Sequence, residues 1–192
     1  MHQLSQAAQV LGRAFQDDPG FEYLVPDEGR RAHLVPSFLG RVIRYCLLYG
    51  EVYTTPTLEG VACWLPPGNT KLTYARMLRT GLLTESLKLG WAGFLKLMYL
   101  EYYLEKIHSR SVVGPHWYLW WLGVEPACQG QSIGSALIQP VLERAEAEGL
   151  PCYLETDNEM NLPFYDRHGF RVVRRVEVVK DGPHFWAMVR RT

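Results

Sequence analysis

The chain has 192 residues, of which 47% are hydrophobic, so we expect one domain over residues 1–192 with a sizeable core. Its 20 basic residues balance 20 acidic ones. This gives no support for a nucleic-acid or membrane partner, because both favour a basic face. The four cysteines are scattered, without a CxxC pair, and we expect them to be reduced in a cytoplasmic protein.

The pattern of apolar residues predicts neither a signal peptide nor a membrane span. The first 15 residues lack a basic patch followed by a continuous apolar core. The most apolar later stretch, residues 90–104, is interrupted by Lys96 and Glu101, whereas a bilayer span needs about 20 apolar residues in a row. We therefore expect a buried or half-buried helix there.

The first half of the chain predicts helices around one β-hairpin. Apolar residues at helical spacing predict helices over residues 4–15 and 31–49. The runs EVYTTP and GVACWLPPG, separated by TLEG, predict the hairpin. A segment rich in Leu, Trp and Tyr then predicts a helical insertion over residues 70–110, with breaks at glycines 81, 90 and 93.

The second half predicts a strand, a helix and a strand over residues 116–124, 133–148 and 152–156. Short connections favour a right-handed crossover between parallel strands. Pro140 is expected to kink the helix, because one backbone donor is missing there. A short helix ended by Gly169 and a last hairpin with Asp-Gly at its turn complete an α/β fold with a mixed sheet.

The segment CQGQSIGSA opens the predicted helix with small residues and two glycines. A helix N-terminus presents unpaired N–H groups and a partial positive charge, so phosphates commonly bind there. A tight turn without a ligand explains a lone glycine pair equally well. The spacing excludes GxxxxGK[ST] and GxGxxG, although Glu155 lies near the distance expected of a ribose-binding acid, which keeps a nucleotide-binding fold as a minor alternative.

Two longer motifs carry a resemblance to a known family. LGVEPACQGQSIGSALI contains Gln129-Gly130-Gln131-Ser132-Ile133-Gly134, and YLETDNEMNLPFYDRHGF contains Asn158, Tyr165, Gly169 and Phe170. Together they resemble the core of the GNAT superfamily of acyl-CoA-dependent N-acyltransferases, whose loop is Q/R-x-x-G-x-G/A. The resemblance covers residues 116–190 well and implies a partly splayed mixed sheet flanked by helices.

The sequence motifs are most similar to those of the puromycin N-acetyltransferase branch of this superfamily. LGVEP, LET, NLPFY followed by R-x-GF, and GP-x-x-W-x-M are all similar to that branch. The first half resembles it more loosely, through AFQDDP and the VACW strand.

The resemblance implies acetyl-CoA as cosubstrate and no metal. It places the pyrophosphate on the backbone amides of residues 129–135 and the pantetheine between splayed strands that end near Val124 and Thr156. The residues implied to bind the cosubstrate are Leu122, Gly123, Val124, Gln129, Gly130, Gln131, Ser132, Ile133, Gly134, Ser135, Asn158, Asn161 and Tyr165.

The sequence departs from the family pattern at two places. Ser132 stands where the family has a glycine, so its side chain and restricted φ are expected to reshape the loop. The family also begins with a strand before its first helix, whereas this sequence starts almost at the helix. Either that strand is missing or Met1 is not the natural start.

Acyl transfer to an amine needs a proton acceptor for the amine and a donor for the leaving thiolate. Tyr165 is the expected acid, because its reference pKa of about 10 exceeds that of a thiol, about 8.5; the alternative is a tyrosine that only packs. Glu155 is the expected base. A structural ion pair with Arg167 explains Glu155 equally well.

Other polar residues near the motifs have weaker roles. Asp157 and His116 are weaker base candidates, and His168 is expected to cap a helix end. By resemblance, a backbone N–H within residues 122–124 stabilises the oxyanion, where the family has a β-bulge.

The acceptor pocket is expected to be built from Trp64, Tyr45 and Tyr49 together with the aromatic segment 74–103, although an aromatic stripe at helical spacing is usually core. We expect acetyl transfer to a primary amine of a small molecule, by direct attack in a ternary complex. A non-catalytic acyl-CoA-binding module, and a protein N-acetyltransferase with an open groove, remain alternatives. A homodimer also stays open.

Overall fold

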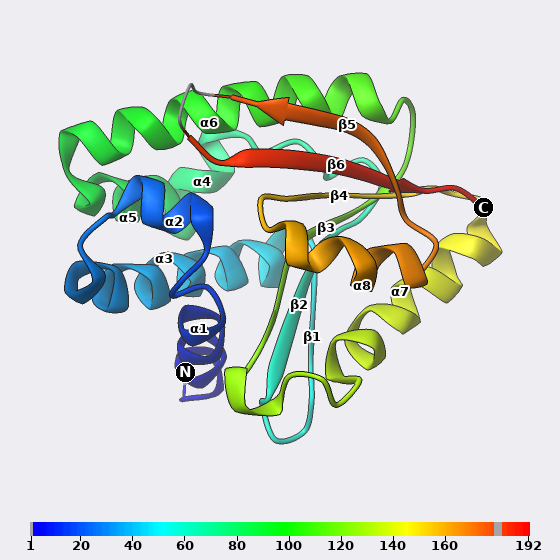
Figure 1. The fold of residues 1–192 in the computed structure, drawn as a ribbon, viewed down its shortest axis with the longest axis horizontal. Coiled ribbons are helices and arrows are strands. Elements are labelled where there is room, and N and C mark those ends of the chain that lie inside the picture. Colours follow the sequence, from blue (N-terminus) through cyan, green and yellow to red (C-terminus); the bar gives the residue numbers. More distant parts are fainter. Residues whose placement is uncertain (1, 179–181) are drawn as a thin grey trace.

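A single mixed sheet organises the computed structural model, which describes residues 2–178 and 182–192. Its six strands run in the order β1-β2-β3-β4-β6-β5 (Figure 1). The strands are β1 (Glu51–Thr54), β2 (Gly60–Leu65), β3 (Trp117–Val124), β4 (Cys152–Thr156), β5 (Arg171–Glu177) and β6 (His184–Arg190). The predicted α/β fold with a mixed sheet is thereby confirmed.

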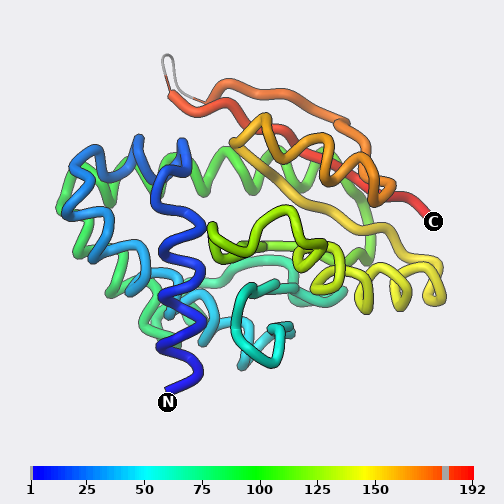
Figure 2. Tube along the Cα trace, turned by 60° about the horizontal axis from the view of Figure 1, so that its bottom comes forward, coloured from blue at the N-terminus to red at the C-terminus, as the bar shows by residue number. Residues whose placement is uncertain are grey.

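Helices connect these strands and cover both faces of the sheet (Figure 2). The α-helices are α1 (His2–Ala14), α2 (Pro19–Leu24), α3 (Glu28–Tyr49), α4 (Tyr74–Thr80), α5 (Leu82–Ser86), α6 (Gly90–Ser111), α7 (Ile133–Glu148) and α8 (Leu162–Arg167). Three 3₁₀ turns are η1 (Leu87–Leu89), η2 (Pro126–Cys128) and η3 (Glu159–Asn161).

The strand pairings confirm both predicted hairpins and the crossover. β1 pairs antiparallel with β2, and β5 pairs antiparallel with β6. β3 and β4 are parallel and joined through α7, which runs unbroken through Pro140. The Asp-Gly turn predicted for the last hairpin begins at Asp181, which lies outside the described residues.

The alternation of side chains along β2 explains why both faces of the sheet are covered. Val61, Cys63 and Leu65 belong to the core beneath α1 and α3, whereas Ala62 and Trp64 belong to a second core beneath α7. Successive side chains of a strand point to opposite faces, so each face of this buried strand needs its own helical layer.

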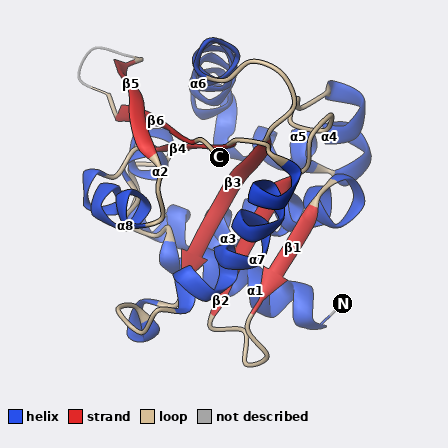
Figure 3. Ribbon diagram, turned by 90° about the vertical axis from the view of Figure 1, so that its right-hand side faces the viewer, coloured by secondary structure: helices blue, strands red, loops and turns tan. Residues whose placement is uncertain are grey.

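β3 and β4 are paired only at their beginnings. Their register joins Trp117 to Cys152 and Tyr118 to Tyr153, with no further pair along the strands. Beyond these residues the strands diverge, as Figure 3 shows for the diagonal β3 and the nearly perpendicular β4. The splay separates the sheet into the halves β1-β2-β3 and β4-β6-β5, and it opens at the ends of β3 and β4.

Helices α4, α5 and α6 occupy the segment that was predicted to be helical and broken at glycines. Gly81 ends α4 in a left-handed conformation, and Gly90 has φ +79° at the start of α6. Gly93 lies inside α6, so a break there was a wrong prediction; a Cβ at Gly93 would lie 2.9 Å from that of Leu89. Close packing, rather than a turn, therefore explains this glycine.

The apolar segment of residues 90–104 forms the first part of α6, which contacts α2 on one side and β5 and β6 on the other. No helix within residues 2–178 and 182–192 has the length and apolar character that a bilayer crossing requires. Within the same residues the first element is α1, and no strand precedes it.

Candidate active site

The loop before α7 leaves backbone amides free at a helix N-terminus. Residues 129–132 are exposed, and none of the described side chains caps the first turn of α7. The first helical bond is donated by Ala136 N–H to the Ser132 carbonyl, so the amides of Ile133, Gly134 and Ser135 have no helical acceptor. An anion placed there would meet several N–H donors and the positive end of the helix dipole.

Ser132 occupies a backbone conformation that normally selects glycine. Its φ is +62° and its ψ is 10°, and Gly130 has φ +76° in the same loop. A left-handed conformation costs an L-residue roughly 1–2 kcal/mol. The loop therefore keeps the glycine geometry even though a serine stands at this position.

Gly134 is also closely packed. A Cβ at Gly134 would lie 3.2 Å from the Phe164 ring, so this position brings α7 close to α8. This close contact therefore places the N-terminus of α7 beside α8, the helix that holds Tyr165.

The end of β3 borders the same loop. Gln129 Nε2 donates to the Val124 carbonyl over 3.2 Å, and Gly123 is buried against α1, where a Cβ would lie 2.7 Å from Leu11. The register of β2 and β3 skips Trp120, with Cys63 opposite Trp121 and Trp64 opposite Leu119. The predicted bulge at residues 122–124 was therefore placed wrongly: it lies at Trp120.

A cavity of about 410 Å³ lies on the α2 and α6 side of the splay. Residues 119–122 of β3, residues 155–156 of β4 and the following Asp157 form its floor, while α2, α6 and residues 70–77 form its walls. Tyr165 lines the end that is nearest α8. The cavity therefore reaches from the helical first half of the chain to the gap between the diverging strands.

Tyr165 is buried at this end of the cavity and exposes 7% of its surface. Burial raises the pKa of its hydroxyl, and the nearby carboxyl groups of Asp157 and Asp18 raise it further. The phenol stays protonated at neutral pH and can donate a proton. Asn161 lines the cavity beside it and donates from Nδ2 to Thr156 Oγ1 over 3.2 Å.

Asn158 has a local structural contact. Its Oδ1 accepts from the Met160 N–H over 3.0 Å and caps η3. The cap fixes the turn between β4 and α8, and so it helps to place Tyr165 at the splay.

Glu155 lines the floor of the cavity, and its partners are tyrosines. Tyr153 Oη donates to Glu155 Oε1 over 2.7 Å, and Tyr118 also bonds this carboxyl group. Burial raises the pKa of Glu155 to about 7, and the two tyrosines lower it less than burial raises it. The suggested ion pair with Arg167 does not form. A carboxyl group with a pKa near 7 can accept a proton at neutral pH.

Asp18 and Asp157 form a second carboxyl pair in the cavity. Asp18 caps α2 by accepting from the N–H groups of Gly20 and Phe21. Burial, followed by the charge of Asp157, raises the pKa of Asp18 well above its usual range, and burial raises that of Asp157 too. A Cβ on Gly20 would collide with the Asp157 carboxyl group. Glycine at position 20 therefore lets α2 approach β4.

His116 lies behind the cavity, bonded to His108. The two Nε2 atoms are 2.7 Å apart, and His116 Nδ1 lies 2.7 Å from the Gly114 carbonyl. Because a carbonyl only accepts, His116 carries its proton on Nδ1 and its Nε2 accepts from His108. Burial lowers the pKa of His108 to about 3, so this ring is neutral. His108, and not His116, lines the cavity.

His168 ends α8, and its Nδ1 lies 2.8 Å from the Phe164 carbonyl. The predicted capping role of His168 is thereby confirmed.

The three aromatic residues predicted for the acceptor pocket lie elsewhere. Trp64 is fully buried beneath α7, on the opposite face of the sheet. Tyr45 is fully buried and packs against Tyr49 and Trp120, with ring centroids 5.1 and 5.3 Å away. None of the three predicted residues lines the cavity. Trp64 faces away because of the strand alternation, and Tyr45 fills the core beneath β3.

Several cavity residues were missed by the sequence reasoning. Asp18 was seen only within the run AFQDDP, and Glu101 only as an interruption of an apolar run. Glu101 and Glu105 are one helical turn apart in that run, where two carboxyl groups on one face of an apolar helix are unusual. This spacing was the signal in the sequence that could have indicated a polar site. It was missed because the sequence did not predict which part of the fold this face of the helix would contact.

Comparisons with known proteins relate this geometry to one enzyme family. The model of the Acetyltransferase (GNAT) family matches residues 88–170, which run from η1 to the end of α8. An uncharacterized N-acetyltransferase of Schizosaccharomyces pombe is 28% identical over 183 residues, covering 92% of this chain and 74% of the relative. A mycothiol acetyltransferase of Streptomyces avermitilis is 35% identical over 74 residues, which cover 37% of this chain and 23% of that protein.

Solved structures share the fold over the whole chain. One described as histone acetyltransferase HPA2 and related acetyltransferase, from Corynebacterium glutamicum, has a TM-score of 0.59 at 21% identity and covers 100% of this chain and 92% of its own. A mosquito arylalkylamine N-acetyltransferase has a TM-score of 0.59 at 16% identity and covers 100% and 96%. At these identities the likeness shows the GNAT fold alone.

The family model and the Schizosaccharomyces pombe relative relate this chain to the GNAT acetyltransferases, and the solved structures add the GNAT fold. They do not specifically show the puromycin branch, which stays a prediction.

Proposed function

We propose that the protein transfers an acetyl group from acetyl-CoA to a primary amine of a small molecule, by direct attack in a ternary complex. One observation carries the proposal: Tyr165 and Glu155 line a single cavity, which opens at the splay between β3 and β4. A proton donor from α8 and a proton acceptor from β4 thus line the cavity into which a thioester would enter. The pKa of Glu155, about 7, suits a proton acceptor at neutral pH, and the raised pKa of Tyr165 keeps its hydroxyl group protonated.

The loop and the splay fit the cosubstrate. The free amides of Ile133, Gly134 and Ser135 would hold its pyrophosphate, and the ends of β3 and β4 would hold the pantetheine between them. When bound, acetyl-CoA supplies the activated acetyl group. A backbone N–H near the end of β3 is proposed to stabilise the charge that develops on the carbonyl oxygen.

The two catalytic residues would move protons in opposite directions. Glu155 accepts a proton from the incoming ammonium group, directly or through a water, so that a neutral amine attacks the carbonyl carbon. Tyr165 donates its hydroxyl proton to the departing sulfur and regains a proton from the acylated nitrogen, which must lose one to become the neutral amide. Tyr118 and Tyr153 hold the Glu155 carboxyl group in position through their hydroxyl groups.

The size and enclosure of the cavity favour a small acceptor over a protein. About 410 Å³ between α2, α6 and the sheet suits a small molecule, whereas a protein N-terminus or lysine would need an open groove. All four cysteines are free, which fits the reducing cytoplasm that we propose as its location.

An acceptor screen tests the proposal. Purified protein is mixed with acetyl-CoA and each member of an amine panel, including aromatic and aliphatic primary amines and puromycin, and thiol release is measured. Release that depends on both the amine and the protein is expected, with the acetylated amine identified by mass spectrometry. Tight acetyl-CoA binding without thiol release from any amine would instead favour the non-catalytic binding module.

A further inference from the structure

The cavity holds more carboxyl groups than the acetylation of a single amine requires. Its lining includes five carboxyl groups and one lysine: Asp18, Glu101, Glu105, Glu155, Asp157 and Lys71. The proposed chemistry uses only Glu155 as a base. The remaining carboxyl groups need another explanation, because burying a carboxyl group is costly unless a partner compensates it.

The five carboxyl groups differ in their partners, and Asp157 shares a hydrogen bond with Asp18. Glu155 is bonded by tyrosines, and Asp18 by backbone N–H groups. Glu105 is exposed near the cavity mouth. Glu101 lies one turn before Glu105 on α6, in the cavity wall opposite β4.

Glu101 is half-buried, and of these groups it is the one in the cavity wall that has no compensating partner among the described residues. Among the described residues, no side chain or backbone group donates a hydrogen bond to Glu101 and none forms an ion pair with it. Burial raises its pKa to about 7, and the charge of Glu105 raises the pKa further. Part of its surface opens into the cavity, so the carboxyl group faces the space in which the acceptor would bind.

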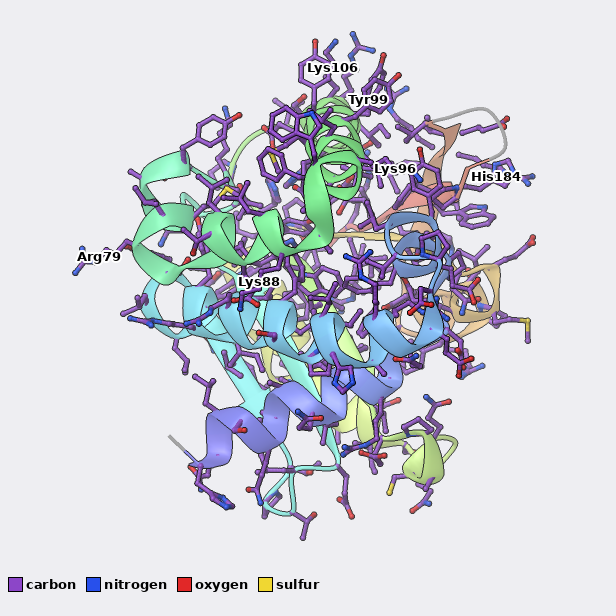
Figure 4. All side chains as sticks on the ribbon, turned by 90° about the vertical axis from the view of Figure 1, so that its left-hand side faces the viewer. Arg79, Lys88, Lys96, Tyr99, Lys106 and His184 are labelled. Atoms are coloured by element: carbon purple, nitrogen blue, oxygen red, sulfur yellow. The ribbon has the colours of Figure 1, made fainter. Side chains whose placement is uncertain are left out.

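The lysines of α6 do not pair with Glu101. Lys106 lies over the Tyr102 ring, 4.2 Å from its centroid, and Lys96 donates to the Tyr23 carbonyl. Figure 4 shows Lys106 and Tyr99 on the outer side of α6. The lysines of α6 therefore pair with other groups, and the Glu101 carboxyl group faces the cavity without a partner in the part of the chain that the structure describes.

The walls beside Glu101 suit an organic cation. Tyr118 and Trp120 line the cavity with aromatic surface, and ring faces attract ammonium groups. Apolar side chains of α6 such as Leu97 and Leu104 also line it, so an alkyl chain between two charges would lie against hydrocarbon.

We propose that the acceptor is a dication, with a reacting amine between Glu155 and Tyr165 and a second, non-reacting ammonium group held by Glu101 on α6. The inference rests on the proposed acetyl transfer and adds the substrate class to it. The second charge compensates the Glu101 carboxyl group, and the alkyl or aryl spacer fills the apolar part of the cavity.

The test compares matched acceptors of equal length. Straight-chain monoamines and α,ω-diamines of three to eight carbons are assayed by thiol release at saturating acetyl-CoA. We expect one diamine length to exceed its monoamine in kcat/KM by about tenfold or more, since a bond to a charged group is worth roughly 1.5–3 kcal/mol. Glu101→Gln should bring this ratio close to one. Glu143→Gln, at an exposed carboxylate of α7, should leave the ratio unchanged.

Binding calorimetry gives a readout that is independent of turnover. Titrating the preferred diamine in two buffers of different ionisation enthalpy at pH 7 should show proton release, because a bound ammonium ionises Glu101. The release should shrink in Glu101→Gln. These titrations use the wild-type protein first, so they decide the question even where the variant folds poorly.

The outcomes separate the two proposals. Monoamines that react as well as diamines at every length would overturn the dication inference and leave acetyl transfer standing. Diamines that bind with proton release but yield no thiol would support the dication site and overturn the proposed enzymatic function. Diamines that neither react nor bind more tightly than monoamines would overturn the inference whatever the acetyl-transfer result.

Discussion

The two sides of the splay between β3 and β4 are built in different ways. On the proposed cosubstrate side, the loop proposed to bind the pyrophosphate occupies residues 129–135, and its neighbour Tyr165 follows on the next α-helix. On the acceptor side, Asp18, Glu101 and Glu155 come from three distant parts of the chain. The first side is formed by a local motif with free backbone groups, and the second by side chains that meet only through tertiary packing. The first therefore depends on backbone conformation, and the second on the charge of individual residues.

Tyr165→Phe gives the largest expected effect and tests whether the two sides meet in one reaction. The variant removes only the hydroxyl group and keeps the ring beneath α7. Turnover should fall about 10²–10⁴-fold, the usual contribution of general acid catalysis, while CoA affinity stays unchanged. Steady-state kinetics and calorimetry measure these two quantities. The loss should shrink with thioesters whose leaving thiol is more acidic.

Wild-type turnover in the Phe variant, under conditions where chemistry limits the rate, would remove Tyr165 from the mechanism. A variant that does not fold would instead show that the hydroxyl group serves packing.

Glu101→Gln tests whether the Glu101 carboxyl group on the acceptor side lacks a compensating partner. The pKa of Glu101 rises from 4.5 to about 7 on folding, so the folded protein holds this proton more tightly than the unfolded chain. The protonated carboxyl group therefore contributes to the free energy of unfolding. This contribution is fully present below pH 4.5 and is lost as the pH rises through 7. Glutamine does not titrate, so the variant should gain stability over wild type between pH 5 and pH 8, by up to about 3 kcal/mol.

Urea unfolding of wild type and Glu101→Gln at pH 5 and at pH 8 measures the difference in their free energies of unfolding. Glu105 and Glu155 face Glu101 and titrate in both proteins, so the comparison is made between variants and not between pH values alone. An equal stability difference at pH 5 and pH 8 would contradict the assignment.

Gly134→Asp tests the cosubstrate side at its backbone. The substitution places a Cβ 3.2 Å from the Phe164 ring and a negative charge beside the free amides. CoA affinity should fall by up to about 30-fold, because the helix terminus contributes up to about 2 kcal/mol to a charged ligand. Gly134→Ala, which adds the Cβ without the charge, is the matched control in calorimetry. An unchanged affinity in the Asp variant would place the pyrophosphate elsewhere.

Ser132→Gly has the smallest expected effect and sharpens the comparison. Glycine adopts φ +62° without strain, but it also loses more freedom on folding, so stability should rise by less than about 1 kcal/mol. CoA affinity should be equal or slightly better. A large loss of CoA binding would show that the serine hydroxyl contacts a phosphate.

The sequence predicted the fold of the second half closely, because its signals are local. The bounds of α7 and β4 agree with the predicted residues 133–148 and 152–156, since periodicity and short connections decide them. The acceptor side was not predictable in the same way. Trp64 and Tyr45 looked like pocket residues from their type, yet strand direction and core packing turn them away. Asp18 and Glu101 meet β4 only because α2 and α6 pack beside it, which no local pattern records.

The short β3–β4 ladder also affects how the chain could be divided. Four antiparallel pairings lie wholly within one half of the sheet or the other, and only two residue pairs join the halves. A nick in residues 129–132 would leave each antiparallel ladder inside one fragment. The chain therefore has a natural division into complementary fragments, and a ligand that spans the splay would act as the bridge that brings them back together.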